Sequence, residues 1–168
     1  MKNLVIYRVI SYILLFIAAF LSVGLFSTLL SALANPLALL PLFLVACVII
    51  YTYCSWRFLV RGLDKGIVSR PVLRDLIKVN GYITLVLAAI CLFQIIMVLL
   101  EPAMIPTIIE QAKAAQPPGN PMGEEMLAKA VQFTLRFLLA YSALLAIHTV
   151  LTLRLVKQNP QVFEEPAN

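Results

Sequence analysis

The chain has 168 residues, of which 62% are hydrophobic and only 12% are charged, and its net charge is +5. Ordinary soluble domains carry about 25% charged residues. A soluble core of this size could not hide so much apolar surface, so the composition indicates an integral membrane protein. It also argues against nucleic-acid binding, because the basic residues flank apolar runs and do not form a long soluble patch.

Four apolar runs are long enough to cross about 30 Å of hydrocarbon as helices, which is the form that a backbone without water requires. They cover residues 9–34, 36–60, 79–100 and 133–153. Asn35 and Pro36 leave only a short connection between the first two, since a residue before proline avoids helical geometry and proline suits a first helical turn. The sequence therefore predicts an all-α protein with four transmembrane helices in two antiparallel hairpins.

The basic residues predict the orientation of the four spans. Ten of the 13 Lys and Arg residues lie before the first span, between the second and third, or after the fourth. Only Lys113, Lys129 and Arg136 lie at the opposite ends. Because cytoplasmic loops are enriched in Lys and Arg, we expect both termini in the cytoplasm.

A second interpretation of the N-terminal region concerns cleavage. The basic start, the apolar run and Ala32-Leu33-Ala34 resemble a signal peptide with its cleavage site. The apolar run is longer than the usual 7–15 residues of such a peptide. We therefore expect the first span to be retained; cleavage would leave three spans and an outer N-terminus.

The cytoplasmic loop, residues 61–78, contains the most patterned polar segment. Ser69 and Pro71 suit the start of a helix, and Arg70, Arg74 and Lys78 then recur every four residues along one face. The sequence predicts a short basic amphipathic helix that runs into the third span. The basic residues at this end are candidates for binding anionic lipid headgroups or an acidic partner, or else they only set the topology. They are Arg57, Arg61, Lys65, Arg70, Arg74 and Lys78.

The outer loop, residues 101–125, is expected to contain a short helix over Met104–Ala112 that lies on the outer leaflet or caps the bundle. A turn-rich stretch at 116–121 follows, and Glu124 and Glu125 suit the positive end of the last helix. The polar tail, residues 158–168, contains two prolines and is expected to be flexible.

The first and third spans share a pattern that suggests an internal repeat. Val9, Tyr12, Ile13, Leu15, Ala18 and Ala19 recur 70 residues later. Spans two and four both end in a threonine followed five residues later by an arginine, at Thr52 and Thr149. The two hairpins would then be parallel repeats about an axis along the membrane normal. Chance identity is the competing explanation, because apolar spans draw on few residue types.

Polar residues inside the spans suggest one candidate layer and one outer ion pair. His148, the only histidine, lies roughly 9 Å from the inner end of its span at Arg154. Tyr12, Tyr51, Thr52 and Thr84 lie at similar depth, so these five residues form a layer if all face inward. Such a layer either serves a transport path or joins the helices by hydrogen bonds, and we favour the second. Arg136 lies near the outer surface, where Glu101 is a plausible partner.

The sequence contains none of the catalytic fingerprints that would indicate an enzyme. The three cysteines lie in apolar runs without a CxxC pair, so we expect no metal and no cofactor. The architecture resembles that of small four-span proteins of the bacterial inner membrane. We expect a non-catalytic accessory, scaffold or regulatory component that binds lipid or another membrane protein. The alternative is a small oligomeric channel or carrier with the polar layer around His148.

Overall fold

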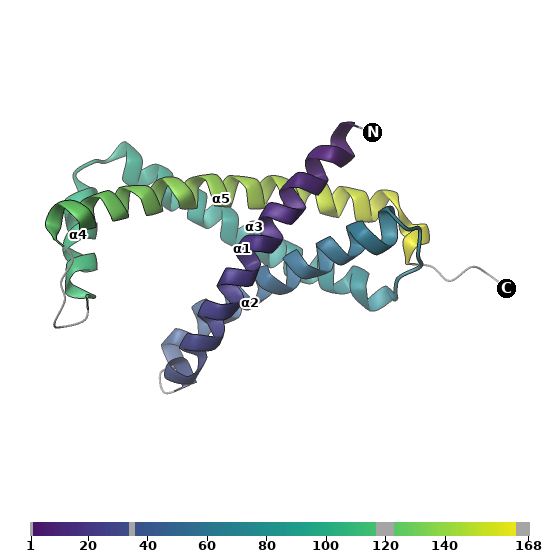
Figure 1. The fold of residues 1–168 in the computed structure, drawn as a ribbon, viewed down its shortest axis with the longest axis horizontal. Helices are drawn as coiled ribbons and strands as arrows, with labels where there is room; N and C mark the ends of the chain where they lie inside the picture. The colour runs from purple at the N-terminus through teal and green to yellow at the C-terminus, as the bar shows by residue number, and fades with distance from the viewer. Residues whose placement is uncertain (1, 34–35, 117–122, 164–168) are drawn as a thin grey trace. The chain divides into compact units, whose positions relative to one another are not determined.

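The computed structural model describes residues 2–33, 36–116 and 123–163, and this part of the chain is helical without β-strands (Figure 1). Four of its helices are long and apolar enough to cross a membrane, which indicates a membrane protein. The elements are α1 (Lys2–Leu33), α2 (Pro36–Arg57), the π-helical turn η1 (Phe58–Leu63), α3 (Pro71–Leu100), α4 (Met104–Ala114), α5 (Glu124–Gln158) and the 3₁₀ turn η2 (Pro160–Val162).

Three of the long helices, α2, α3 and α5, begin where the sequence predicts a start, whereas α1 begins at Lys2, before the predicted span. Pro36 and Pro71 open α2 and α3, since the fixed φ of proline suits a first turn that needs no N–H donor. Glu124 and Glu125 open α5. The basic segment after Pro71 is continuous with the third span and does not form a separate helix. The expected connection at Asn35 and most of the turn-rich stretch lie outside the described residues.

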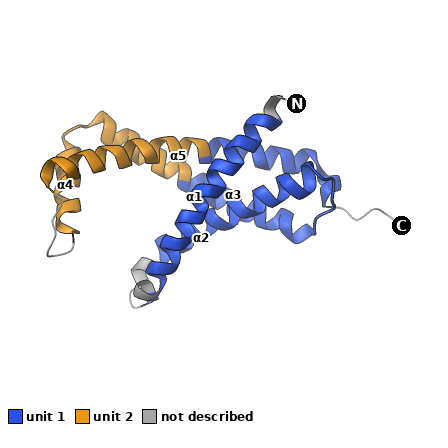
Figure 2. Ribbon diagram, viewed as in Figure 1, with its two compact units in different colours: residues 1–87, 145–168 blue, residues 88–144 orange. Residues whose placement is uncertain are grey.

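The chain forms two compact units, which Figure 2 shows in different colours. Unit 1 comprises residues 1–87 and 145–168, so it contains α1, α2, η1, the first part of α3 and the last part of α5. Unit 2 comprises residues 88–144, which include α4. Within unit 1, α1 packs along α2. The start of α1, the end of α2 with η1, the start of α3 and the end of α5 form what we call the basic end.

The C-terminal turn packs onto the basic end, whereas the sequence predicts a flexible tail from residue 158. Val162 and Phe163 are buried, and the Phe163 ring stacks on Phe58 with ring centroids 5.4 Å apart. The Ser69 amide donates a 2.7 Å hydrogen bond to the Val162 carbonyl. The expectation is therefore wrong for residues 159–163, because two apolar side chains there find a place to be buried. Residues 164–168 lie outside the described part.

The buried positions of α1 and α3 share one register. All five buried positions given for α1 have a buried counterpart 70 residues later. These pairs are Tyr7/Ile77, Ile10/Asn80, Ser11/Gly81, Leu14/Thr84 and Ala18/Ala88. For α2 with η1 and α5, an offset of 97 residues pairs five of the nine buried positions with a buried counterpart. These pairs are Val48/Leu145, Tyr51/His148, Thr52/Thr149, Ser55/Thr152 and Leu59/Val156. Burial therefore follows the offsets that the sequence identities suggest, although most of these pairs are not identical residues.

Candidate functional site: two basic grooves and a buried polar cluster

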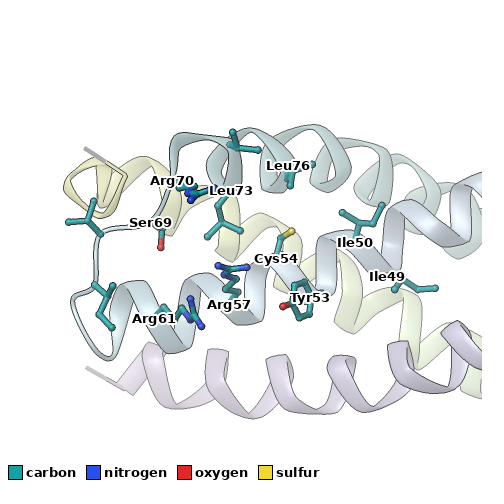
Figure 3. A pocket seen from close by; sticks show the side chains of 13 residues that line it. Ile49, Ile50, Tyr53, Cys54, Arg57, Arg61, Ser69, Arg70, Leu73 and Leu76 are labelled. Carbon is teal, nitrogen blue, oxygen red and sulfur yellow. The ribbon is translucent and has the colours of Figure 1, made fainter. Parts of the chain in front are cut away.

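A groove of about 830 Å³ runs between α2 with η1 on one side and the start of α3 on the other (Figure 3). We call it groove 1. Three arginines line it at the basic end: Arg57, Arg61 and Arg70. Aliphatic side chains line it further along, among them Ile49, Ile50, Leu73 and Leu76. Groove 1 is therefore cationic at the basic end and apolar along the rest of its length.

The backbone around groove 1 explains how the arginines come together. At the end of α2 the helix widens into η1, where the Asp64 amide bonds to the Leu59 carbonyl five residues back. Such π-helical turns are often found at functional sites. Gly66 has a φ of 62°, which lets the chain reverse toward Ser69 and Arg70. Arg70, at the start of α3, thus faces the groove that Arg57 and Arg61 line from the other side.

Among the described residues, no carboxylate compensates the charge of groove 1. In residues 2–33, 36–116 and 123–163 no carboxylate forms an ion pair with Arg57, Arg61 or Arg70. Guanidinium groups bind phosphate oxygens in a bidentate manner, and burying aliphatic surface favours an apolar chain beside them. A ligand with an anionic head and a hydrocarbon tail matches both parts of the groove.

The other three predicted basic residues lie elsewhere. Lys65 is exposed in the turn after η1 and lines neither groove. Arg74 and Lys78 line a second groove, of about 350 Å³, between α3 and the end of α5. We call it groove 2. Lys157 also lines groove 2. It was not predicted as a binding residue, because the prediction covered only the basic residues around the loop between the second and third spans.

The buried polar cluster of unit 1 is centred on His148, whose ring is fully buried. Its Nε2 lies 2.8 Å from the Ser11 hydroxyl and its Nδ1 lies 2.8 Å from the Tyr51 hydroxyl. The Tyr51 hydroxyl also donates to Thr152 Oγ1, and the Tyr7 hydroxyl lies 3.1 Å from the same oxygen. The Tyr7 ring stacks on the imidazole at a centroid distance of 4.8 Å.

Counting protons defines the state of this cluster. Hydrogen bonds from Ser11 to the Tyr7 carbonyl and from Thr152 to the His148 carbonyl complete a set of six. Four hydroxyls and a neutral imidazole supply five protons. A charged imidazole would supply the sixth, but burying a charge without a carboxylate costs far more than one hydrogen bond. The neutral cluster therefore makes five of its six bonds at any moment.

The predicted polar layer and the observed cluster overlap only in His148 and Tyr51. Tyr12 is 53% exposed and does not join the cluster; the neighbouring Ser11 takes that place. Thr52 is buried and donates to the Val48 carbonyl of its own helix. Thr84 is buried, and its hydroxyl has no partner among the described residues. Four of the five residues are therefore buried, and only Tyr12 does not face inward, because equal depth does not place residues on the same face.

The predicted outer ion pair does not form. Glu101 and Arg136 are both exposed, and within the described residues no ion pair joins them. The ion pairs of unit 2 are instead Lys113 with Glu124, which joins α4 to α5, and Lys129 with Glu125, one turn apart on α5. The expectation rested on depth alone, which does not place two residues on facing sides of their helices.

Searches for related proteins do not assign the chain to a family. No family model, no curated protein and no solved structure matches it. Among the described residues, no group of three or more His, Cys, Asp or Glu side chains is arranged to hold a metal ion. The two grooves and the buried cluster are therefore the features from which a function has to be argued.

Proposed function

We propose that this protein is a non-catalytic membrane component that binds anionic phospholipid in groove 1, as an accessory, scaffold or regulatory subunit of a larger membrane assembly. It lies in the plasma membrane, the inner membrane of a bacterium, with both termini and the basic end in the cytoplasm. The observation that carries the proposal is the set of three arginines at one end of an apolar groove, none of which forms an ion pair with another described residue. The cytoplasmic leaflet is the one that holds anionic lipid within reach of such residues.

The orientation is supported by how charge divides between the units. Ten of the 13 cations belong to unit 1. Four of the eight carboxylates belong to unit 2, which carries three cations. Positive loops remain in the cytoplasm during insertion, which favours unit 1 as the cytoplasmic side.

The contacts of His148 favour a packing role over the alternative, a small channel or carrier. Neither groove is lined by His148, Ser11 or Tyr51. Each ring nitrogen of His148 already has a hydroxyl partner from another helix. Hydrogen bonds of this kind join helices in lipid, where apolar packing alone provides little specificity.

The shared burial register also supports the two hairpins as parallel repeats. Unlike sequence identity, burial is not biased by the small set of residue types in apolar spans. A repeat would make α1 the counterpart of α3 and α2 the counterpart of α5. Superposing the two pairs of helices in an experimental structure tests this; failure to overlay in order and direction would contradict it.

The single tryptophan gives a direct test of groove 1. Trp56 precedes Arg57, and its ring centroid lies 6.1 Å from that of Tyr53, a residue that lines groove 1. Bromine on lipid chains quenches tryptophan at short range. In vesicles of phosphatidylcholine with a small fraction of brominated lipid, we expect brominated phosphatidylglycerol to quench Trp56 more strongly than brominated phosphatidylcholine does.

Arg57→Gln combined with Arg61→Gln should remove most of this preference. Each cation near an anionic surface contributes about 1 kcal/mol, so two correspond to roughly a thirtyfold loss of relative affinity. The matched control is Lys129→Gln with Arg136→Gln in unit 2, which removes the same charge and should leave the preference intact. Equal quenching by the two lipids in the unmodified protein would refute the proposal.

A further inference from the structure

A comparison of the two hairpins singles out one difference in charge. Under the 70-residue offset, Arg8 of α1 corresponds to Lys78 of α3. Arg8 forms an ion pair with Asp64, in the turn that follows η1. Under the 97-residue offset, Asp64 corresponds to Gln161, in the turn that follows α5. The first hairpin thus has a cation with its own carboxylate, and the second has the cation with a neutral residue at the matching position.

Groove 2 lies in the second hairpin, which has Gln161 in place of this carboxylate. Three cations line it: Arg74, Lys78 and Lys157. Within the described part of the chain, neither lysine forms an ion pair. Arg74 Nε lies 3.7 Å from the Asp75 carboxylate, which is too far for a hydrogen bond, and this buried atom has no other partner among the described residues.

A buried donor that has no partner among the described residues is costly to leave unsatisfied, and Lys78 and Lys157 line the same groove. A phosphate provides several acceptor oxygens and a negative charge, which suits one guanidinium and two ammonium groups together. Leu153 and Val156 provide apolar surface in the same groove, and Tyr82 lies at its edge as an aromatic side chain of the kind that favours the membrane interface.

We propose that groove 2 is a second binding site, for the headgroup phosphate of an anionic phospholipid, which takes the place that Asp64 occupies in the first hairpin. The inference extends the lipid binding proposed for groove 1 and assumes the same orientation, but it concerns different residues on another side of α3. The occupant is a lipid and not a soluble phosphate, because the groove pairs its cations with aliphatic side chains.

Native mass spectrometry of the protein released from nanodiscs of phosphatidylglycerol and phosphatidylcholine tests the two sites separately. We expect two tightly retained phosphatidylglycerol molecules on the unmodified protein. Lys78→Gln with Lys157→Gln should reduce this number to one, and Arg57→Gln with Arg61→Gln should also reduce it to one. The four changes together should leave none. If only the groove 1 variant loses a lipid, groove 2 is not a site and the proposed function stands; if only the groove 2 variant does, the proposed function fails.

Gln161→Glu provides a gain-of-charge test that removes no binding residue. A carboxylate at the position matching Asp64 should pair with Lys78 or Lys157 and displace the second lipid. Gln111→Glu, an equal change of charge on α4 in unit 2, should retain both lipids. Retention of both by Gln161→Glu would overturn the proposal. Inorganic phosphate added to the sample should not displace the lipid, and displacement would overturn the lipid as the occupant.

Discussion

The two units of this protein hold their helices together by different means. In unit 1, four hydroxyls, an imidazole and a stacked tyrosine join α1, α2 and α5 in the buried interior. In unit 2 the ion pairs lie on exposed side chains, and the ring stack of Phe133, Phe137 and Tyr141 runs along a single helix. In lipid, an apolar contact between helices can be replaced by a contact with lipid at little cost in free energy. Hydrogen bonds between helices therefore favour one arrangement over others. The comparison indicates that the interior of unit 1 is fixed by hydrogen bonds between its helices.

The largest effect is expected from the centre of that interior. His148→Leu should leave the Ser11 and Tyr51 hydroxyls without their imidazole partner and lower the free energy of unfolding by about 2 to 4 kcal/mol. Unfolding by SDS titration in mixed micelles measures this. Phe133→Ala in unit 2, where the side chain is 71% exposed, should change it far less. Equal losses would remove the distinction between the units.

The next largest effect is expected where the C-terminal turn packs. A Cβ at Gly62 would lie 2.5 Å from Val162 Cγ1. Gly62→Val should therefore displace the C-terminal turn and lower the free energy of unfolding by about 1 to 3 kcal/mol. Hydrogen exchange of the Ser69 amide, which bonds to Val162, should become faster. Gly24→Val, where nothing lies within 4 Å, is the control and should leave this exchange unchanged.

A smaller effect is expected from the ion pair that joins α1 to the turn after η1. A double-mutant cycle of Arg8→Gln and Asp64→Asn should give a coupling of about 0.5 kcal/mol, since both side chains are partly exposed. The same cycle for Glu125 and Lys129 in unit 2, which are more exposed, should give less. High salt should reduce both couplings; a larger value in unit 2 would reverse the comparison.

The smallest effect is expected at the exposed contact between α4 and α5. The hydrogen bond and charge of Glu124 raise the pKa of Lys113 above its ordinary value. While Glu124 is ionised, the contact therefore has its full strength below the pKa that Lys113 has in the unfolded chain. It is lost as pH rises through the raised pKa of Lys113 in the folded chain. NMR titration of the Lys113 side chain should show a lower midpoint in Glu124→Gln, and an unchanged midpoint would contradict the pairing.

The sequence predicts where most of the long helices begin, but it does not predict which side of each helix faces the interior. The starts of α2, α3 and α5 follow from proline and carboxylate chemistry, and the four spans follow from their length and hydropathy. The side of α1 that faces His148 was predicted wrongly, since Ser11 and not Tyr12 contacts the imidazole. The depth of a residue can be counted from the end of its span. The side of the helix that it occupies cannot be counted in this way, because lipid is as apolar as a protein core. The lipid-facing side of α1 therefore lacks the polar residues that mark the exposed side of a helix in a soluble protein.

A periodic signal for the inner face was nevertheless present. Tyr7 and Ser11 lie four residues apart on α1, as His148 and Thr152 do on α5, and each pair stacks polar groups on one helical face. Groove 1 could be anticipated only in part. Arg57 and Arg61 share a helix, but their approach to Arg70 depends on the widened turn of η1 and on Gly66, which no hydropathy pattern indicates.

The division of unit 1 between two distant stretches of the chain has a consequence for biosynthesis. Residues 1–87 leave the ribosome well before residues 145–163, so α1 and α2 enter the bilayer before His148 and Thr152 have been translated. During that interval the Tyr7, Ser11 and Tyr51 side chains lack their partners on α5. Only Ser11 keeps a partner in that interval, the Tyr7 carbonyl of its own helix, and the arrival of α5 supplies the other bonds. Assembly of unit 1 is therefore ordered in time: α1 and α2 come first, and α5 completes the hydrogen-bonded interior.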